Sequence, residues 1–230
     1  MNGLLDYFSL GYYTGVIARL LAILGFLILR RQKRKELKMF ELYFIIYASY
    51  EIPFILTSFF ETDRHFIVFV SRLVDYLFTM FEFFVFYDYI YIALAGINRT
   101  IIQFLSLLYY LISVLVLLRI LVVTSRIPFE IMQHAFILQA TLLLFMCVLY
   151  FLKIFNSKPT LDLIKEPSFW IITGLTFCML CTFPLTVLLS NIFHKNYELY
   201  TQLFSIFYFF YIILFIMIIR ASLCKKIIAS

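Results

Sequence analysis

Seven long apolar stretches, separated by short polar segments, fill nearly all of this 230-residue chain. The hydrocarbon core of a bilayer is about 30 Å thick, so a helix needs about 20 mostly apolar residues to cross it. Each stretch reaches that length, and little sequence remains outside them. The predicted spans are residues 7–29, 39–60, 66–95, 101–125, 128–155, 167–193 and 198–222. The sequence therefore predicts one domain, residues 1–230, built as a seven-helix transmembrane bundle.

Composition and patterning favour an all-α polytopic membrane protein. The chain is 64% hydrophobic and 14% charged, whereas soluble domains carry about 25% charged residues. Irregular backbone cannot face lipid, so apolar segments of this length are expected to be helices. A transmembrane barrel would alternate apolar and polar residues in shorter segments. Residues 209–219, which are apolar or aromatic throughout, show no such alternation.

The distribution of Lys and Arg predicts the orientation. Six of the nine residues 30–38 are basic, and the loops that share this predicted side carry further Lys and Arg, while the opposite side holds only Arg64, Arg126 and Lys195. Short loops rich in Lys and Arg stay in the cytoplasm. We therefore expect an outside N-terminus, a cytoplasmic C-terminus and a multi-pass location in the inner membrane of a bacterium. The basic loops should attract anionic lipids, so the net charge of +6 does not indicate nucleic-acid binding.

Ionisable residues inside the spans are the strongest indication of function. They are costly in a bilayer, face the bundle interior or a cavity, and mark functional sites by default. Most of them lie in the predicted outer half, on the second to fifth spans. The residues predicted to bind a ligand are Arg19, Glu51, Arg72, Asp75, Glu82, Arg119 and His134.

The third span places several of these groups together. Asp75 and Glu82 are seven residues apart and so share one helical face, with Thr79 between them and Arg72 one turn away. Pro53 and Pro184 should bend the second and sixth spans, which suggests a cavity that opens outward. Three readings remain open: ion pairs that only fix the bundle, a ligand pocket, or a path for protons or ions.

Signatures of enzymes and cofactor sites are not found in the sequence. There is no His-Glu-x-x-His, no Gly-x-Ser-x-Gly and no glycine-rich phosphate loop. Cys178 and Cys181 form a C-x-x-C inside an apolar span, where small packing residues are the simpler interpretation. The last span has no lysine to hold retinal. We expect no enzyme activity, no catalytic residue, no metal site and no cofactor.

Two segments carry a resemblance to a known family. Residues 74–84 hold a Tyr-rich segment that leads to Glu82-Phe83, and residues 167–174 read Pro-Ser-Phe-Trp-Ile-Ile-Thr-Gly. Both are similar to elements of a family of small seven-helix integral membrane proteins of Bacteroidota. That family in turn resembles the seven-helix sensory modules of bacterial signalling proteins. On this resemblance, Glu82 and Trp170 are the positions of interest.

The residues of the Pro-x-Phe-Trp element also have a physical interpretation of their own. Proline suits the first turn of a helix. Trp170 should anchor the sixth span at the cytoplasmic interface, and Gly174 should let a neighbouring helix approach closely.

The leading functional expectation is a sensor-like or receptor-like module. It would bind a small or lipidic ligand in the outer-half polar pocket and report to a separate cytoplasmic or membrane signalling partner. The alternatives are a small secondary transporter, in which Glu82 and Asp75 carry protons or substrate, and a structural accessory subunit of a membrane complex. The resemblance supports the sensor, and the intramembrane carboxyl groups alone do not separate these alternatives.

Overall fold

The described part of the chain is entirely helical. The computed structural model describes residues 2–49, 64–95, 99–123, 129–156, 163–193 and 197–224. Within these ranges it forms α-helices and two 3₁₀ turns, and no strand. The elements are α1 (Asn2–Gln32), η1 (Lys35–Leu37), α2 (Lys38–Ser49), α4 (Arg64–Ala93), α5 (Arg99–Val123), α6 (Phe129–Asn156), η2 (Leu163–Lys165), α7 (Pro167–Phe193) and α8 (Tyr197–Leu223).

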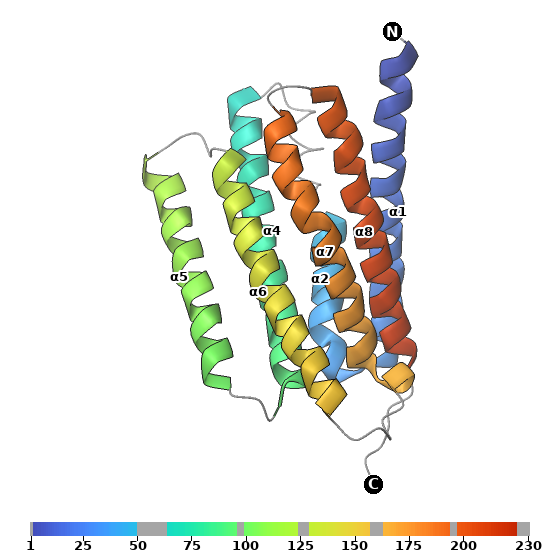
Figure 1. Ribbon diagram of the computed structural model, residues 1–230. Coiled ribbons are helices and arrows are strands. Elements are labelled where there is room, and N and C mark those ends of the chain that lie inside the picture. Colours follow the sequence, from blue (N-terminus) through green and yellow to red (C-terminus); the bar gives the residue numbers. More distant parts are fainter. Residues whose placement is uncertain are drawn as a thin grey trace.

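The helices lie side by side as one bundle, in which α1 begins at one end and α8 finishes at the opposite end (Figure 1). Helix α8 packs against α7 and α1, α1 also packs against α2, and α6 packs against α7 and α4. Helix α5 lies at one edge, against α4 and α6 (Figure 1). We name the two ends of the bundle the N-terminus end and the C-terminus end.

Six of these helices are long and apolar enough to cross a membrane. Their qualifying segments are Tyr13–Gln32, Leu73–Ala93, Thr100–Arg119, Gln133–Asn156, Pro167–Leu189 and Ser205–Leu223. Within the described residues the prediction of an all-helical, multi-pass chain is confirmed. The predicted limits agree to within two residues for α4, α5, α6, α7 and α8, whereas α1 begins five residues earlier and ends three residues later than the predicted span 7–29. Helix α2 is described for 12 residues. The remainder of the predicted span 39–60, with Pro53, lies outside the described residues.

Glycines allow the closest contacts between helices. A Cβ on Gly174 of α7 would lie 2.7 Å from the Cβ of Met217 on α8. A Cβ on Gly25 of α1 would lie 2.5 Å from the ring of Phe44 on α2. Neither distance is compatible with a side chain, so both helix pairs depend on glycine. The expected close approach at Gly174 is confirmed.

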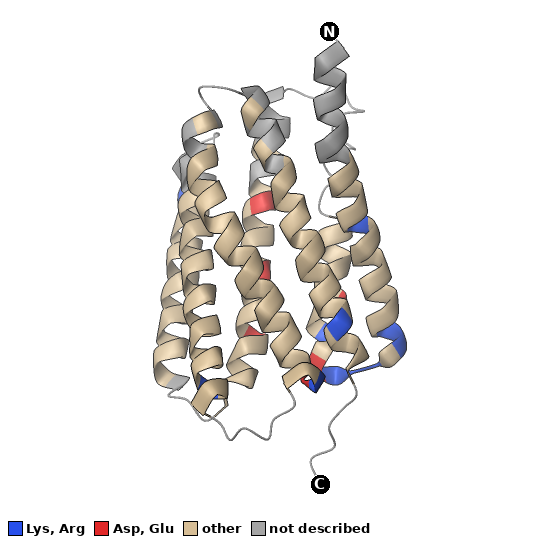
Figure 2. Ribbon diagram, turned by 45° about the vertical axis from the view of Figure 1, so that its right-hand side comes forward, with Lys and Arg blue, Asp and Glu red and all other residues tan. Residues whose placement is uncertain are grey.

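Among the described residues, the charged positions are unevenly distributed along the bundle. Lys and Arg positions gather near the C-terminus end, whereas several Asp and Glu positions lie between the two ends (Figure 2). At the C-terminus end, Lys153 Nζ donates to the carbonyl oxygens of Ala93 and Ala95 at 2.8 Å each. It thereby satisfies carbonyls at the end of α4 that no helical N–H reaches.

Candidate functional site

The candidate site centres on the carboxyl group of Glu82, which lies in the middle of α4. Tyr43 Oη on α2 donates to Oε1 at 2.8 Å. Gln139 Nε2 on α6 and Tyr211 Oη on α8 donate to Oε2 at 3.0 and 3.2 Å. Four helices therefore meet at one acidic side chain. We refer to Glu82, Tyr43, Gln139 and Tyr211 as the Glu82 cluster.

The Glu82 cluster is deeply buried. Glu82 is 1% exposed, and Tyr43 and Gln139 are 0% exposed. A buried carboxylate is costly unless it is hydrogen-bonded or paired with a cation. Among the described residues, the hydrogen bonds to the Glu82 carboxyl come from neutral groups only. The described residues therefore show no ion pair between Glu82 and an arginine that would hold the bundle together.

Aromatic packing fixes the two tyrosines of the cluster. The Tyr43 ring stacks on Phe78 with centroids 6.0 Å apart and meets Phe215 edge-on at 6.1 Å. Tyr47 lies between Tyr211, at 5.6 Å, and Phe215, at 4.6 Å. Edge-on and offset contacts of this kind are the favoured geometries of aromatic pairs. The hydroxyl groups are thus held toward Glu82 by rings from three helices.

Polar groups continue from the cluster toward the N-terminus end. Thr182 and Thr186 on α7, Gln133 on α6 and Ser205 on α8 are all buried. Gln133 Nε2 donates to the carbonyl oxygen of Thr186 at 3.1 Å and so joins α6 to α7. Thr186 Oγ1 donates to the carbonyl oxygen of Thr182, one turn nearer the cluster. Asp75 lies on the same side of the cluster, about 10 Å along α4 from Glu82.

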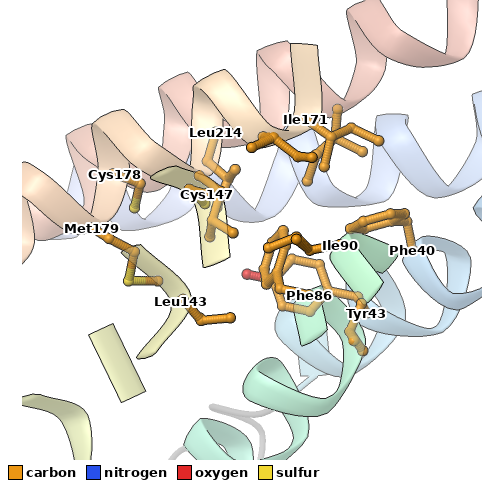
Figure 3. Close-up of a cluster of buried hydrophobic side chains, with 14 of the residues drawn as sticks. Phe40, Tyr43, Phe86, Ile90, Leu143, Cys147, Ile171, Cys178, Met179 and Leu214 are labelled. Atoms are coloured by element: carbon orange, nitrogen blue, oxygen red, sulfur yellow. The ribbon is translucent and has the colours of Figure 1, made fainter. Parts of the chain in front are cut away.

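Apolar groups line the other side of the cluster next to Glu82. Proceeding from Glu82 toward the C-terminus end, α4 contributes Phe86 and Ile90, and both are fully buried. Leu143 and Cys147 of α6, Ile171 of α7 and Leu214 of α8 are also fully buried and come together with them (Figure 3). Within about one turn of the cluster, this side is therefore apolar. Polar atoms follow further along it, because Thr173 Oγ1 and Tyr150 Oη are buried without a hydrogen-bond partner among the described residues.

Helix α8 links the Glu82 cluster to the C-terminus end. It carries Tyr211 and, two to three turns on, Arg220, and Cys224 directly follows its last residue. The Arg220 guanidinium lies over the Trp170 ring, 5.5 Å from its centroid. Trp170 Nε1 donates to the carbonyl oxygen of Ile164 at 2.8 Å, and Arg34 Nη2 donates to that of Cys224. Movement of α8 would thus reach the loop between α1 and α2 and the 3₁₀ turn η2.

The seven residues predicted to bind a ligand are not gathered into one pocket within the described residues. Glu82 is at the centre of the cluster, and Asp75 is half-buried on the same helix. Arg19 is half-buried on α1, where its Nη2 and the Tyr208 ring both lie 3.5 Å from a Cβ built on Gly15.

The remaining predicted residues are exposed or are not described. Arg119 and His134 are exposed on α5 and α6. Arg72 belongs to α4, but its side chain is outside the described part, as is the whole of Glu51. Ligand binding by these seven residues stays a prediction.

Sequence reasoning missed the three partners of Glu82. Tyr43 and Tyr211 are two of 17 tyrosines, and nothing local separates them from those at the interface. Gln139 had a usable signal, because an uncharged amide in the middle of the apolar segment 135–145 is costly without a partner.

The cysteines and carboxylates form no metal centre within the described residues. No group of three or more His, Cys, Asp or Glu is placed to hold an ion there. Cys178 is buried, Cys181 is half-buried, and both thiols are free. Comparison of the chain with protein-family models, with curated proteins and with solved structures finds no match.

Proposed function

We propose that the chain is a receptor-like sensor that spans the bacterial inner membrane seven times. In this proposal the N-terminus is outside, the C-terminus is cytoplasmic, and α2 with the residues that follow it forms the seventh span. A small or lipidic ligand enters the half of the bundle between the Glu82 cluster and the N-terminus end, and its binding changes the contacts of the Glu82 cluster. The expected distribution of Lys and Arg and the resemblance to sensory modules both support this arrangement.

The observation that carries the proposal is the one-sided polarity around Glu82. Buried Thr182, Thr186 and Gln133 lie between the cluster and the N-terminus end, whereas fully buried Phe86, Ile90 and Leu143 lie next to the cluster on its other side. A sensor needs access from one face only, because it transmits a conformational change rather than a solute. A ligand that shifts α8 through Tyr211 would change the contacts of Arg220 and Cys224, where a cytoplasmic partner could detect them.

Accessibility of engineered cysteines tests the proposed access route. The four native cysteines are replaced by alanine, and Thr186→Cys is compared with Leu214→Cys, which lies on the apolar side of Glu82 and is fully buried. A membrane-impermeant thiol reagent is applied to intact spheroplasts and to inverted vesicles. Thr186→Cys should be labelled only from the outer face and Leu214→Cys from neither face. Labelling of Thr186→Cys from the cytoplasmic face would contradict the proposal.

A small secondary transporter is the second candidate function. The observation in its favour is that Asp75 and Glu82 place two carboxyl groups on one face of α4. A transporter predicts flux in proteoliposomes that Glu82→Gln abolishes, while the variant keeps its fold. A sensor predicts ligand-dependent unfolding temperatures without flux.

A further inference from the structure

The Gln139 side chain is only partly satisfied by its surroundings. Its Nε2 donates to Glu82 Oε2 at 3.0 Å, but its Oε1 is buried and has no hydrogen-bond partner among the described residues. Gln139 is 0% exposed. Buried side-chain oxygens almost always have a partner, so an unsatisfied one next to a buried acid calls for an explanation.

The packing around Glu82 restricts what could satisfy that oxygen. Glu82, Tyr43 and Gln139 are all at most 1% exposed, and aromatic rings cover the two tyrosines. A proton needs no additional volume. It also changes what the Glu82 carboxyl can do, because a carboxylate only accepts hydrogen bonds whereas a carboxylic acid also donates one.

We propose that Glu82 and Gln139 together form a proton-binding site in which the Gln139 amide serves both protonation states. In the carboxylate state, Nε2 donates to Oε2, as observed. When a proton from the outer aqueous phase binds Oε2, the amide rotates by 180° and Oε1 accepts the new O–H hydrogen bond. One O–H bond of a hydronium ion breaks, leaving water, as the Oε2–H bond forms. The hydrogen bond from Nε2 to Oε2 is exchanged for the one from Oε2–H to Oε1, and Nε2 moves to the position without a partner that Oε1 held. The inference rests on the proposed function, because the proton arrives by the same polar half of the bundle.

The other groups that face Glu82 are weaker acids or are uncharged. Tyr43 of α2 and Tyr211 of α8 donate to its carboxyl oxygens. Cys178 of α7 and Tyr109 of α5 interact with it electrostatically. Proton binding would remove the negative charge toward which both tyrosine hydroxyls point. The contacts of α2 and α8 would weaken together, which makes the site a pH-sensitive element of the sensor.

Infrared titration of the full chain in lipid nanodiscs tests the proton site. Spectra recorded from about pH 4 to about pH 9 cover ordinary and shifted carboxyl groups. We expect a carboxylic-acid carbonyl band that titrates in the wild type, survives Asp75→Asn and disappears in Glu82→Gln. If Glu82→Gln does not fold, Glu82→Asp replaces it and should displace the band. Failure to find any band that depends on Glu82 would overturn the proposal.

The role of Gln139 is tested by a matched pair of substitutions on α6. Gln139→Leu should move the band to higher wavenumber, because the acid loses its acceptor. It should also move the midpoint by at least about half a pH unit, a threefold change in proton affinity. Gln133→Leu makes the same change in a residue that donates to Thr186 rather than to Glu82. It should shift neither the band nor the titration midpoint. Equal effects of both substitutions, or none from Gln139→Leu, would overturn the assignment.

The outcomes separate this proposal from the proposed function. If the Glu82 band titrates but Thr186→Cys is labelled from the cytoplasmic face, the proton site stands and access from the outside is wrong. If labelling is one-sided but no Glu82 band titrates, the receptor-like proposal stands and the proton site is wrong.

Discussion

Gln139 Nε2 lies 3.0 Å from Glu82 Oε2, although 57 residues separate the two positions in the chain. This contact joins α6 to α4 in the interior of the bundle. Together with the hydroxyls of Tyr43 and Tyr211 it gives Glu82 three hydrogen bonds, all from neutral donors. Because no cation contributes among these partners, the response of the protein to neutralising Glu82 should differ from that of a protein held by a buried ion pair.

Glu82→Gln should change the free energy of unfolding by no more than about 1 kcal/mol, a typical value for one membrane hydrogen bond. Removing one partner of a buried ion pair typically costs about 3–5 kcal/mol, because the other charge is stranded. No stranded charge is expected at Glu82. Thermal unfolding of the two proteins in the same detergent measures the difference.

A loss of about 3 kcal/mol or more in Glu82→Gln would show that the group is structural and paired with a cation outside the described residues. Asp75→Asn, on the same face of α4, is the control for removing a carboxylate from this helix without touching the Glu82 cluster.

Tyr43→Phe should destabilise the protein more than Tyr211→Phe. The Tyr43 hydrogen bond is the shorter one, at 2.8 against 3.2 Å, and Tyr43 is fully buried whereas Tyr211 is half-buried. A hydrogen bond inside a membrane typically contributes about 1 kcal/mol, and we expect Tyr43→Phe to lose about that much. Equilibrium unfolding in mixed micelles gives both values.

A double-mutant cycle ties the effect of Tyr43→Phe to the carboxyl group. In the Glu82→Leu background, Tyr43→Phe should cost clearly less than in the wild type, since its acceptor is gone. Equal costs in both backgrounds would place the effect in ring packing rather than in the hydrogen bond.

The helices were predictable from the sequence, whereas the partners of Glu82 were not. Span length is set by bilayer thickness, which is why residues 167–193 were assigned correctly as one helix. Burial of Glu82 follows from the cost of an ionisable group in lipid. Which tyrosines reach it depends on how α2, α4 and α8 are rotated and paired. That information lies in contacts across 39 and 129 residues, and no local pattern encodes it.

Arg119 and His134 illustrate the same limit. Both were assigned to the polar interior because charged side chains in spans usually face it. The structure places both on the exposed surface of the bundle. Arg119 lies near the end of its helix, where a long side chain can extend toward the interface with its charge in water. The position of a residue along its helix can be predicted from the sequence. Which side of the helix faces the interior depends on the helices that pack against it.

Gly174→Ala should destabilise the protein by about 1–3 kcal/mol, the usual cost of adding a methyl group to a full interface. The new Cβ would lie 2.7 Å from the Met217 Cβ, an atom that cannot move without the α8 backbone. Gly15→Ala is the matched control, because its nearest neighbours lie at 3.5 Å. Ala is the better helix former by up to about 1 kcal/mol, so this control should be neutral or stabilised. Equal losses at both glycines would contradict the close approach of α7 and α8.

Trp170 is the single tryptophan of the chain, so its fluorescence reports the position of one end of α7 in the bilayer. Its indole N–H donates to Ile164 and its ring contacts Arg220, which places it among polar groups. Tryptophan favours the headgroup level of a membrane.

In nanodiscs, a quencher attached near the lipid headgroup should therefore reduce the Trp170 emission more than one attached near the end of the lipid acyl chain. In proteoliposomes of defined orientation, a water-soluble quencher should act mainly from the side that carries the C-terminus. Stronger quenching by the quencher attached near the end of the acyl chain would contradict this position. It would mean that α7 begins inside the hydrocarbon core and that η2 also lies within the membrane.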